Sequence, residues 1–193
     1  RSGLKPQCVF FSESARAAAD RLLPQIGAHA ETLLVPDAMF TSAVPSNTPQ
    51  GVAALVKTPA TSLDDLLQRD GAGPLVVAAG LQDPGNLGTI LRSAEAFGAA
   101  GLILTEGTVS LYNTKVLRGS AGSAFRLPAV HANSAELLAA FKLHGVRLLA
   151  TSSHKGTPLP QVDWKLPLAI FIGNEGAGLP RELTGKMDET VVI

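Results

Sequence analysis

The sequence predicts an α/β protein with a mainly parallel sheet, covered by helices on both faces, in two domains of unequal size. Short apolar runs typical of buried strands alternate with stretches of helical periodicity, an order that produces parallel strands joined by crossover helices. A chain of 193 residues with 46% hydrophobic content can bury one large core together with a small satellite core.

The smaller domain is expected at residues 1–57. Its strand-like segments are CVFF, TLLVP and GVAALVK, and an Ala-rich helix is expected at about 12–23. A hinge or linker with a short helix is expected at 58–73, because a cluster of Gly and Pro residues ends this stretch. The larger domain then covers residues 74–193.

The larger domain opens with a buried strand, a tight turn and an amphipathic helix. The strand occupies residues 75–79, and Asp-Pro-Gly at 83–85 ends it. Asn86 is expected to cap the helix, and Gly98 is expected to end it. The residues expected on its buried face recur at helical spacing: Leu87, Ile90, Leu91, Ala94 and Phe97.

The remaining elements continue the alternation. Strands are expected at 101–107, 126–132, 146–153 and 168–173. Helices are expected to start at residue 113 or 114, at Asn133 with capping-box spacing, and after Leu179-Pro180. Ligand sites of parallel sheets lie at the carboxyl ends of strands, where Thr151, Ser152 and Gly173 fall.

Arg92 lies about one turn beyond Gly88 and Thr89, on another face of the first helix of this domain. Helical side chains lean toward the N-terminus, so its guanidinium can reach the preceding turn. Free backbone N–H groups and the positive end of the helix dipole converge there, which suits an anion such as a phosphodiester. The alternative is that Arg92 only pairs with Glu95 on a solvated face.

A second glycine-rich loop, GNEGAGLP, follows the strand expected at 168–173. Its glycines run in the reverse order of the dinucleotide fingerprint, and neither glycine loop has the lysine of a phosphate-binding loop, so an NAD enzyme and an NTPase fit poorly. Such a loop exposes backbone groups that can bind adenine or ribose. The alternative is a simple strand-to-helix turn.

The formal net charge is zero, which argues against a protein that holds nucleic acid by bulk charge. Residues 112–128 contain three basic residues and no acid. This stretch is a candidate phosphate-binding patch or else a solvated basic loop.

Cys8 is the single cysteine, which excludes an internal disulfide and is compatible with a reducing cytosol. No apolar stretch reaches the ~18 residues of a membrane helix, so a soluble protein is expected.

Two motifs resemble those of a known family. DPGNLGTILRSAEAFGAAG at 83–101 resembles motif 1, and IFIGNEGAGLP at 170–180 resembles motif 2, of the SpoU (TrmH) RNA ribose 2'-O-methyltransferases of the SPOUT superfamily. Residues 112–128 are similar to the basic Gly/Ser-rich segment between them. Residues 1–57 resemble, more loosely, an N-terminally incomplete L30e-like substrate-binding domain, which in relatives helps to select the RNA.

The resemblance implies a trefoil-knot domain in which S-adenosylmethionine provides the methyl group for a ribose 2'-hydroxyl, without a metal. The residues implied in cofactor binding are Thr151, Gly173, Asn174, Gly176 and Ile193. Asn86 would hold the motif 1 loop and the ribose, and Glu175 would organise the site. Arg92 is the base in family proposals, but because a guanidinium stays protonated at neutral pH we expect it to orient phosphate and hydroxyl. The residues implied in RNA binding are Lys115, Arg118 and Arg126.

The family's third motif, an Ile-Pro strand and a Ser-Leu-Asn loop, is expected to begin at Ile193, so part of the cofactor pocket and of the dimer surface would lie beyond it. The expected protein is a cytoplasmic homodimer that methylates RNA, with ribosomal RNA as the first substrate and tRNA as the alternative. A noncatalytic RNA-binding or ribosome-assembly factor on the same scaffold is the alternative from another class.

Overall fold

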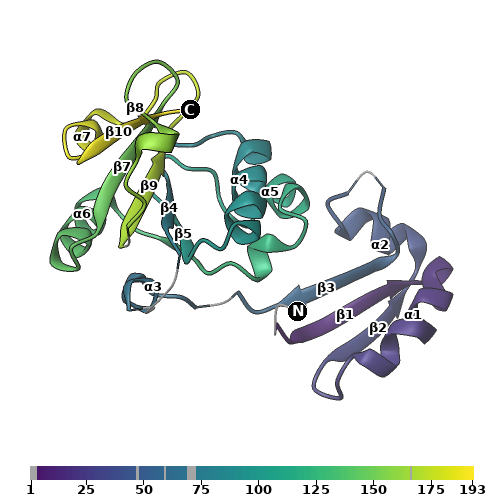
Figure 1. Ribbon diagram of the computed structural model, residues 1–193. Helices are drawn as coiled ribbons and strands as arrows, with labels where there is room; N and C mark the ends of the chain where they lie inside the picture. The colour runs from purple at the N-terminus through teal and green to yellow at the C-terminus, as the bar shows by residue number, and fades with distance from the viewer. Residues whose placement is uncertain (1–3, 47, 59, 69–72, 166) are drawn as a thin grey trace. The chain divides into compact units, whose positions relative to one another are not determined.

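A computed structural model of the chain describes residues 4–46, 48–58, 60–68, 73–165 and 167–193 (Figure 1). The chain divides into two compact units, Arg1–Ala60 and Thr61–Ile193. Each unit has its own sheet and its own buried core. Within the described ranges, no helix is both long enough and apolar enough to cross a lipid bilayer.

The first unit packs helices against a small sheet. Its described residues form three strands in the order β2-β1-β3, with β1 parallel to β2 and antiparallel to β3. Val9 and Phe11 of β1 pack with Ala19 of α1 in the core of this unit. The helix α2 had not been predicted, whereas the three strands had. The elements are β1 (Pro6–Ser12), a 3₁₀ turn (Glu13–Ala15), α1 (Arg16–Leu22), a second 3₁₀ turn (Leu23–Gln25), β2 (Glu31–Val35), α2 (Asp37–Ala43) and β3 (Val52–Val56).

The sheet of the second unit is parallel, as predicted. Its described strands run in the order β6-β5-β4-β9-β7-β10-β8, and every neighbouring pair is parallel. Figure 1 shows β4 and β9 side by side in the middle of this sheet. The strands are β4 (Leu75–Ala78), β5 (Gly101–Leu104), β6 (Ala129–His131), β7 (Arg147–Ser152), β8 (Thr157–Pro158), β9 (Leu168–Ile172) and β10 (Glu189–Val192).

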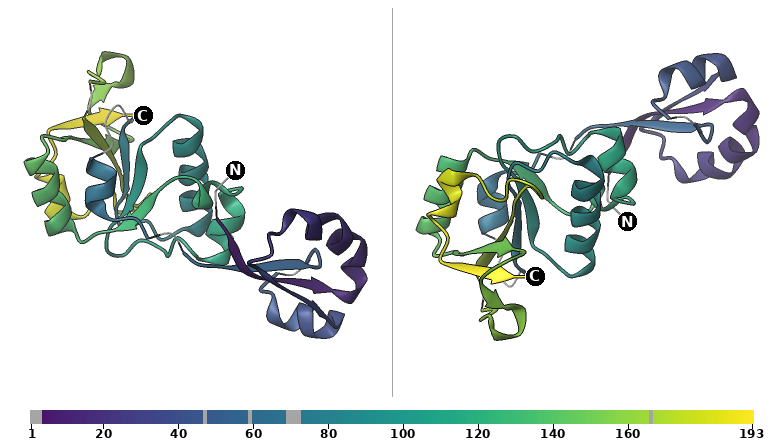
Figure 2. Two further views of the ribbon diagram at one scale, coloured as in Figure 1. Left: turned by 90° about the horizontal axis from the view of Figure 1, so that it is seen from below. Right: turned by 90° about the horizontal axis from the view of Figure 1, so that it is seen from above.

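Helices cover both faces of this sheet, and Figure 2 shows the two layers. Alternate residues of β4 point to opposite faces. Val77 packs in the core beneath α3, α6 and α7, whereas Val76 packs beneath α4 and α5. The helices are α3 (Leu63–Leu67), α4 (Pro84–Ala96), α5 (Thr114–Gly119), α6 (Ser134–Leu143) and α7 (Arg181–Thr184), with 3₁₀ turns at Ser123–Phe125 and Leu159–Gln161.

The segment predicted as a linker, residues 58–73, contains a helix of the second unit. α3 begins with a capping box at Ser62, which satisfies backbone N–H groups at the helix start. Leu66 is 2% exposed and packs in the core of the second unit. α3 therefore belongs to that unit rather than to a linker. Parts of the segment lie outside the described residues, namely 59 and 69–72.

Phe97 had been predicted to lie on the buried face of α4, and this prediction is wrong. Leu87, Leu91 and Ala94 are buried, but Phe97 is 88% exposed. At 3.6 residues per turn, Phe97 lies about 80° around the helix axis from Leu87, beyond the edge of the apolar stripe. It also follows the last helical residue, and Gly98 then turns the chain with a positive φ of 76°.

Candidate active site

The start of α4 is capped by Asp83. Its Oδ1 accepts a hydrogen bond of 2.7 Å from the backbone N–H of Asn86, and Pro84 occupies the first helical position. The predicted cap at Asn86 is therefore wrong by three residues. Proline favours the first turn and holds the residue before it in an extended conformation, which is the geometry that a cap needs. As a result, the Asn86 side chain is free to act elsewhere.

Asn86 links the two motifs that the sequence had singled out. Its Nδ2 donates a hydrogen bond to Oε1 of Glu175, in the loop that follows β9. β4 and β9 are neighbouring parallel strands, so their carboxyl ends place the start of α4 beside this loop. Glu175 had been expected to organise the site, and the contact that the structure shows for it is this bond to Asn86.

The loop after β9 is closed by backbone hydrogen bonds. Asn174 and Gly178 exchange two of them, at 3.0 and 2.8 Å. A Cβ on Gly173 would lie 2.4 Å from the carbonyl carbon of Gly178, so only glycine permits this approach. Oδ1 of Asn174 accepts bonds from the N–H groups of Gly176 and Ala177, at 2.9 and 3.1 Å. The side-chain amide oxygen of Asn174 therefore shapes the loop.

A pocket of about 520 Å³ lies between this loop and the end of β4. Asn174 is the one predicted cofactor residue among its lining residues, whereas Gln82 and Arg181 had not been predicted at all. The sequence offers only one sign of each residue: Gln82 follows the end of a strand, and Arg181 follows the glycine-rich loop. The lining residues are Ala79, Gly80, Gln82, Asn174, Ala177, Gly178, Leu179, Pro180 and Arg181.

Thr151 and Ile193 lie at the carboxyl ends of the next two strands. Thr151 of β7 donates a hydrogen bond of 3.0 Å from its Oγ1 to the carbonyl of Phe171 in β9. The N–H of Ile193 donates to the carbonyl of Ser152 at 3.1 Å, while the Ile193 side chain is exposed. The carboxyl ends of β9, β7 and β10 therefore lie along one edge of the sheet.

Arg92 is exposed on α4 and has no hydrogen-bond or ion-pair partner among the described residues. The alternative interpretation, a pair with Glu95, is wrong. Glu95 instead accepts two hydrogen bonds from Arg126 and one of 2.6 Å from the Ser123 hydroxyl. The bonds from Arg126 and then from Ser123 hold the pKa of the Glu95 carboxyl at about 2. Arg92 is left available for a ligand.

The basic residues of the segment 112–128 differ in their surroundings. Lys115 and Arg118 are exposed on α5, whose N-cap Asn113 accepts a bond from the Lys115 N–H at 2.9 Å. Arg126 is engaged with Glu95, so it fastens the segment to α4. This pair was missed because the acid-free stretch 112–128 gives no sign of a partner on another helix.

Two glycines bring α4 and α5 into contact. A Cβ on Gly88 would lie 2.9 Å from both the Cα and the carbonyl carbon of Gly119. Ser120, which follows, is completely buried, and its hydroxyl donates to the carbonyl of Leu117 at 2.8 Å. The backbone of α5 is therefore packed closely against α4, the helix that carries Arg92.

Comparison with known proteins identifies the family. The sequence pattern of the SpoU rRNA Methylase family matches residues 73–193. The chain belongs to this family. It is 34% identical over 154 residues to the 23S rRNA (guanosine(2553)-2'-O)-methyltransferase RlmP of Bacillus subtilis, a match that covers 80% of the chain and 60% of the relative.

Two further comparisons are with proteins of Streptomyces viridochromogenes. The chain is 34% identical over 167 residues to its 23S rRNA (uridine(2479)-2'-O)-methyltransferase, covering 83% of the chain and 58% of the relative. The crystal structure of the SpoU methyltransferase AviRb with the cofactor AdoMet superposes with a TM-score of 0.85 at 30% identity, covering 100% of the chain and 75% of that protein. The predicted α/β fold is therefore confirmed. The chain spans about three fifths of the length of the two curated relatives.

Proposed function

We propose that this protein transfers a methyl group from S-adenosylmethionine to a ribose 2'-hydroxyl of ribosomal RNA. The observation that carries the proposal is the hydrogen bond between Asn86 and Glu175, which joins the start of α4 to the glycine loop after β9. The substrate class follows from relatives named as 23S rRNA 2'-O-methyltransferases. The cofactor follows from the SpoU structure determined with AdoMet.

The residues at the strand ends fit such a cofactor. The loop around Gly173 and Gly176 is compact backbone with little side-chain bulk, which suits the flat adenine and the ribose. The proposed binding residues are Thr151, Gly173, Asn174, Gly176 and Ile193. When bound, S-adenosylmethionine supplies an electrophilic methyl group on a sulfonium centre.

The chain's own contribution is alignment of the RNA. Arg92 would bind phosphate and the attacking hydroxyl, and Asn86, held by Glu175, would fix the ribose beside it. Good orientation can contribute roughly 7 to 11 kcal/mol, compared with about 3 to 5 kcal/mol for a general base. Because a guanidinium stays protonated at neutral pH, Arg92 would orient and polarise the hydroxyl rather than remove its proton.

Further parts of the proposal concern the whole protein. We propose a cytoplasmic homodimer with a trefoil-knot methyltransferase domain, as the SpoU motifs at 83–101 and 170–180 imply. Lys115 and Arg118 would bind RNA phosphates, since both are exposed on α5. The first unit, which resembles an L30e-like domain, would help to select the RNA.

The experiment is transfer of labelled methyl groups to RNA, followed by mass mapping of the methylated nucleotide in RNA from cells with and without the gene. We expect label on one ribose of ribosomal RNA. Arg92→Lys keeps the charge but loses the planar fork, so it should lower kcat at least tenfold. Arg21→Lys, at an exposed arginine of α1, should leave kcat unchanged. RNA binding without methyl transfer would support a noncatalytic RNA-binding factor instead.

A further inference from the structure

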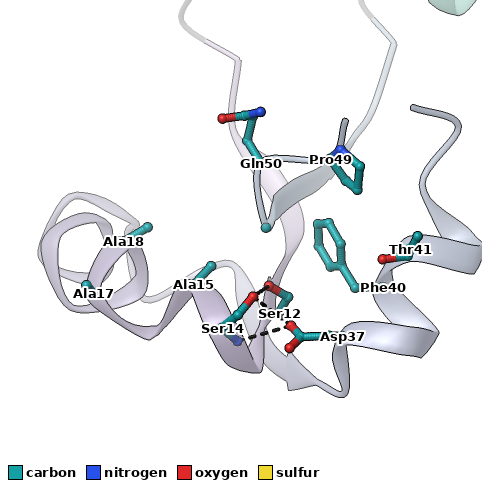
Figure 3. A pocket seen from close by; sticks show the side chains of 11 residues that line it. Ser12, Ser14, Ala15, Ala17, Ala18, Asp37, Phe40, Thr41, Pro49 and Gln50 are labelled. Atoms are coloured by element: carbon teal, nitrogen blue, oxygen red, sulfur yellow. Dashed lines mark hydrogen bonds between the residues drawn. The ribbon is translucent and has the colours of Figure 1, made fainter. Parts of the chain in front are cut away.

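The first unit contains a pocket of about 630 Å³ that no comparison assigns to a function (Figure 3). It lies where the parallel strands β1 and β2 end, because Ser12 is the last residue of β1 and Asp37 follows β2. Carboxyl ends of parallel strands are the usual place for ligands in α/β proteins. The lining residues are Ser12, Ser14, Ala15, Ala17, Ala18, Asp37, Phe40, Thr41, Pro49, Gln50 and Gly51.

The floor of the pocket is fixed by a close backbone approach. The N–H of Ser12 donates to the carbonyl of Gly51 at 2.9 Å. Gly51 has a φ of +72°, and a Cβ there would lie 2.4 Å from the Cβ of Ala15 and 2.8 Å from Oγ of Ser12. Only glycine fits such a position. Ser12 and Phe40 are each 3% exposed, so the floor of the pocket is closely packed without a ligand.

One ionised acid lies in this pocket. Oδ1 of Asp37 accepts a bond of 2.8 Å from the Ser14 hydroxyl and one of 3.1 Å from the Ser14 N–H, as Figure 3 shows. These bonds lower the pKa of the Asp37 carboxyl, so the group is a pure hydrogen-bond acceptor at neutral pH. A carboxylate has about four acceptor positions, two on each oxygen. Both bonds from Ser14 fall on Oδ1, so Oδ2 is the acceptor left for a ligand.

The lining residues define the chemistry of the ligand. None of them is basic, so the pocket does not suit a phosphate group. Ala15 and Pro49 provide apolar walls above the floor that contains Phe40, and Asp37 provides an acceptor. The matching ligand is a flat, neutral group with adjacent N–H donors. Among the RNA bases, guanine alone presents two neighbouring donors, N1–H and N2–H₂, on one edge, and RNA is usually read through such unpaired bases.

We propose that this pocket receives an unpaired guanine of the RNA substrate, with Oδ2 of Asp37 accepting its N1–H and N2–H₂ groups. The proposal rests on the proposed function only in taking RNA as the substrate. It gives the first unit a role in selecting the sequence near the target, separate from the phosphate contacts of Lys115 and Arg118. A base contact through two hydrogen bonds of this kind gives about tenfold discrimination against the wrong base.

The test measures binding of the full chain, without cofactor, to three short uridine-rich RNAs that differ at one central base: guanine, hypoxanthine or adenine. Phosphates are equal in all three, so basic side chains elsewhere contribute equally. We expect the guanine RNA to bind about tenfold more tightly than the adenine RNA, and hypoxanthine, which lacks the N2 amino group, to bind with intermediate affinity.

Asp37→Asn should abolish the preference for guanine. The amide oxygen can still accept the Ser14 bonds, but the amide NH₂ then replaces the acceptor Oδ2 and faces the N–H donors of guanine. Asp20→Asn, at an exposed acid of α1, is the matched control and should retain the preference. Thr41→Trp should also abolish the preference, by filling the pocket. Thermal unfolding of each variant confirms that it is folded.

Equal binding of the three RNAs by the parent chain, or a guanine preference that survives in both Asp37→Asn and Thr41→Trp, would overturn the proposal. The methyl-transfer experiment is independent of this one. A methyltransferase without guanine preference would refute only the base pocket. A guanine preference without methyl transfer would support the base pocket and refute the proposed enzyme activity.

Discussion

The side-chain amide of Asn86, near the start of α4, donates a hydrogen bond to the carboxylate of Glu175, which lies 89 residues further along the chain. This bond joins motif 1 to motif 2, and it does so because Asp83 takes over the capping of α4. The loop after β9 and the helix that carries Arg92 are therefore positioned by one another.

Loss of the bond between Asn86 and Glu175 should lower catalysis without unfolding the chain. A hydrogen bond to a charged group in contact with solvent contributes about 1.5 kcal/mol, so Asn86→Ala and Glu175→Ala should each lower kcat for methyl transfer about tenfold. The double variant should be no worse than either single variant, because both remove the same bond. Multiplicative losses in a double-mutant cycle would show that the residues act independently.

The ion pair between Glu95 and Arg126 should stabilise the chain in a pH-dependent way. The folded-state pKa of Glu95 is about 2, below its ordinary value of 4.5, so the stabilisation is present above pH 4.5 and is lost as pH falls toward 2. Solvent partly screens the pair, so Glu95→Gln should cost about 1 kcal/mol at pH 7. Urea unfolding at pH 7 and near pH 2 measures this cost, which should be much smaller at the lower pH, where about half of the Glu95 carboxyl is protonated.

The matched control is Glu182→Gln, at an exposed acid of α7. Its effect on the free energy of unfolding should be small at both values of pH. A Glu95→Gln effect that is the same at pH 7 and near pH 2 would contradict a contribution from the ionised pair.

Gly88→Ala should destabilise the second unit. The new methyl group would lie 2.9 Å from backbone atoms of Gly119. Such overpacking lowers the free energy of unfolding by about 1 to 3 kcal/mol. Thermal unfolding should show a lower Tm. Gly185→Ala is the control, because a Cβ there meets nothing within 4 Å and its φ is −80°. Equal Tm values for the two variants would disprove the close packing of α4 on α5.

Lys115 and Arg126 should differ in their effect on RNA binding. Lys115→Ala and Arg118→Ala should each make the salt dependence of binding shallower by about one phosphate contact. Arg126→Ala should leave the slope unchanged and lower the stability, because Arg126 is paired with Glu95. The measurement is the affinity for RNA at several salt concentrations. A slope reduced as much by Arg126→Ala as by Arg118→Ala would place Arg126 in the interface.

Much of the fold is readable from local sequence. The run Leu75–Ala78 is apolar at every position, as buried parallel strands are, and the Asn133 cap of α6 has its expected bond to the Glu136 N–H at 2.8 Å. Periodicity is less informative at element ends. Phe97 continues the helical spacing of α4, yet it lies beyond the last helical residue and is exposed.

The sequence by itself determined the alternation of strands and helices, the two glycine loops and the candidate residues, because turn chemistry and hydrophobic spacing are local properties. Only the tertiary structure decided the partners. In the folded chain Glu95 pairs with Arg126, and Asn86 donates a hydrogen bond to Glu175. Asp37 lies in a pocket, where it accepts a hydrogen bond from Ser14. These pairings depend on which strand lies beside which, and that order is set by the packing of the whole sheet rather than by any local pattern.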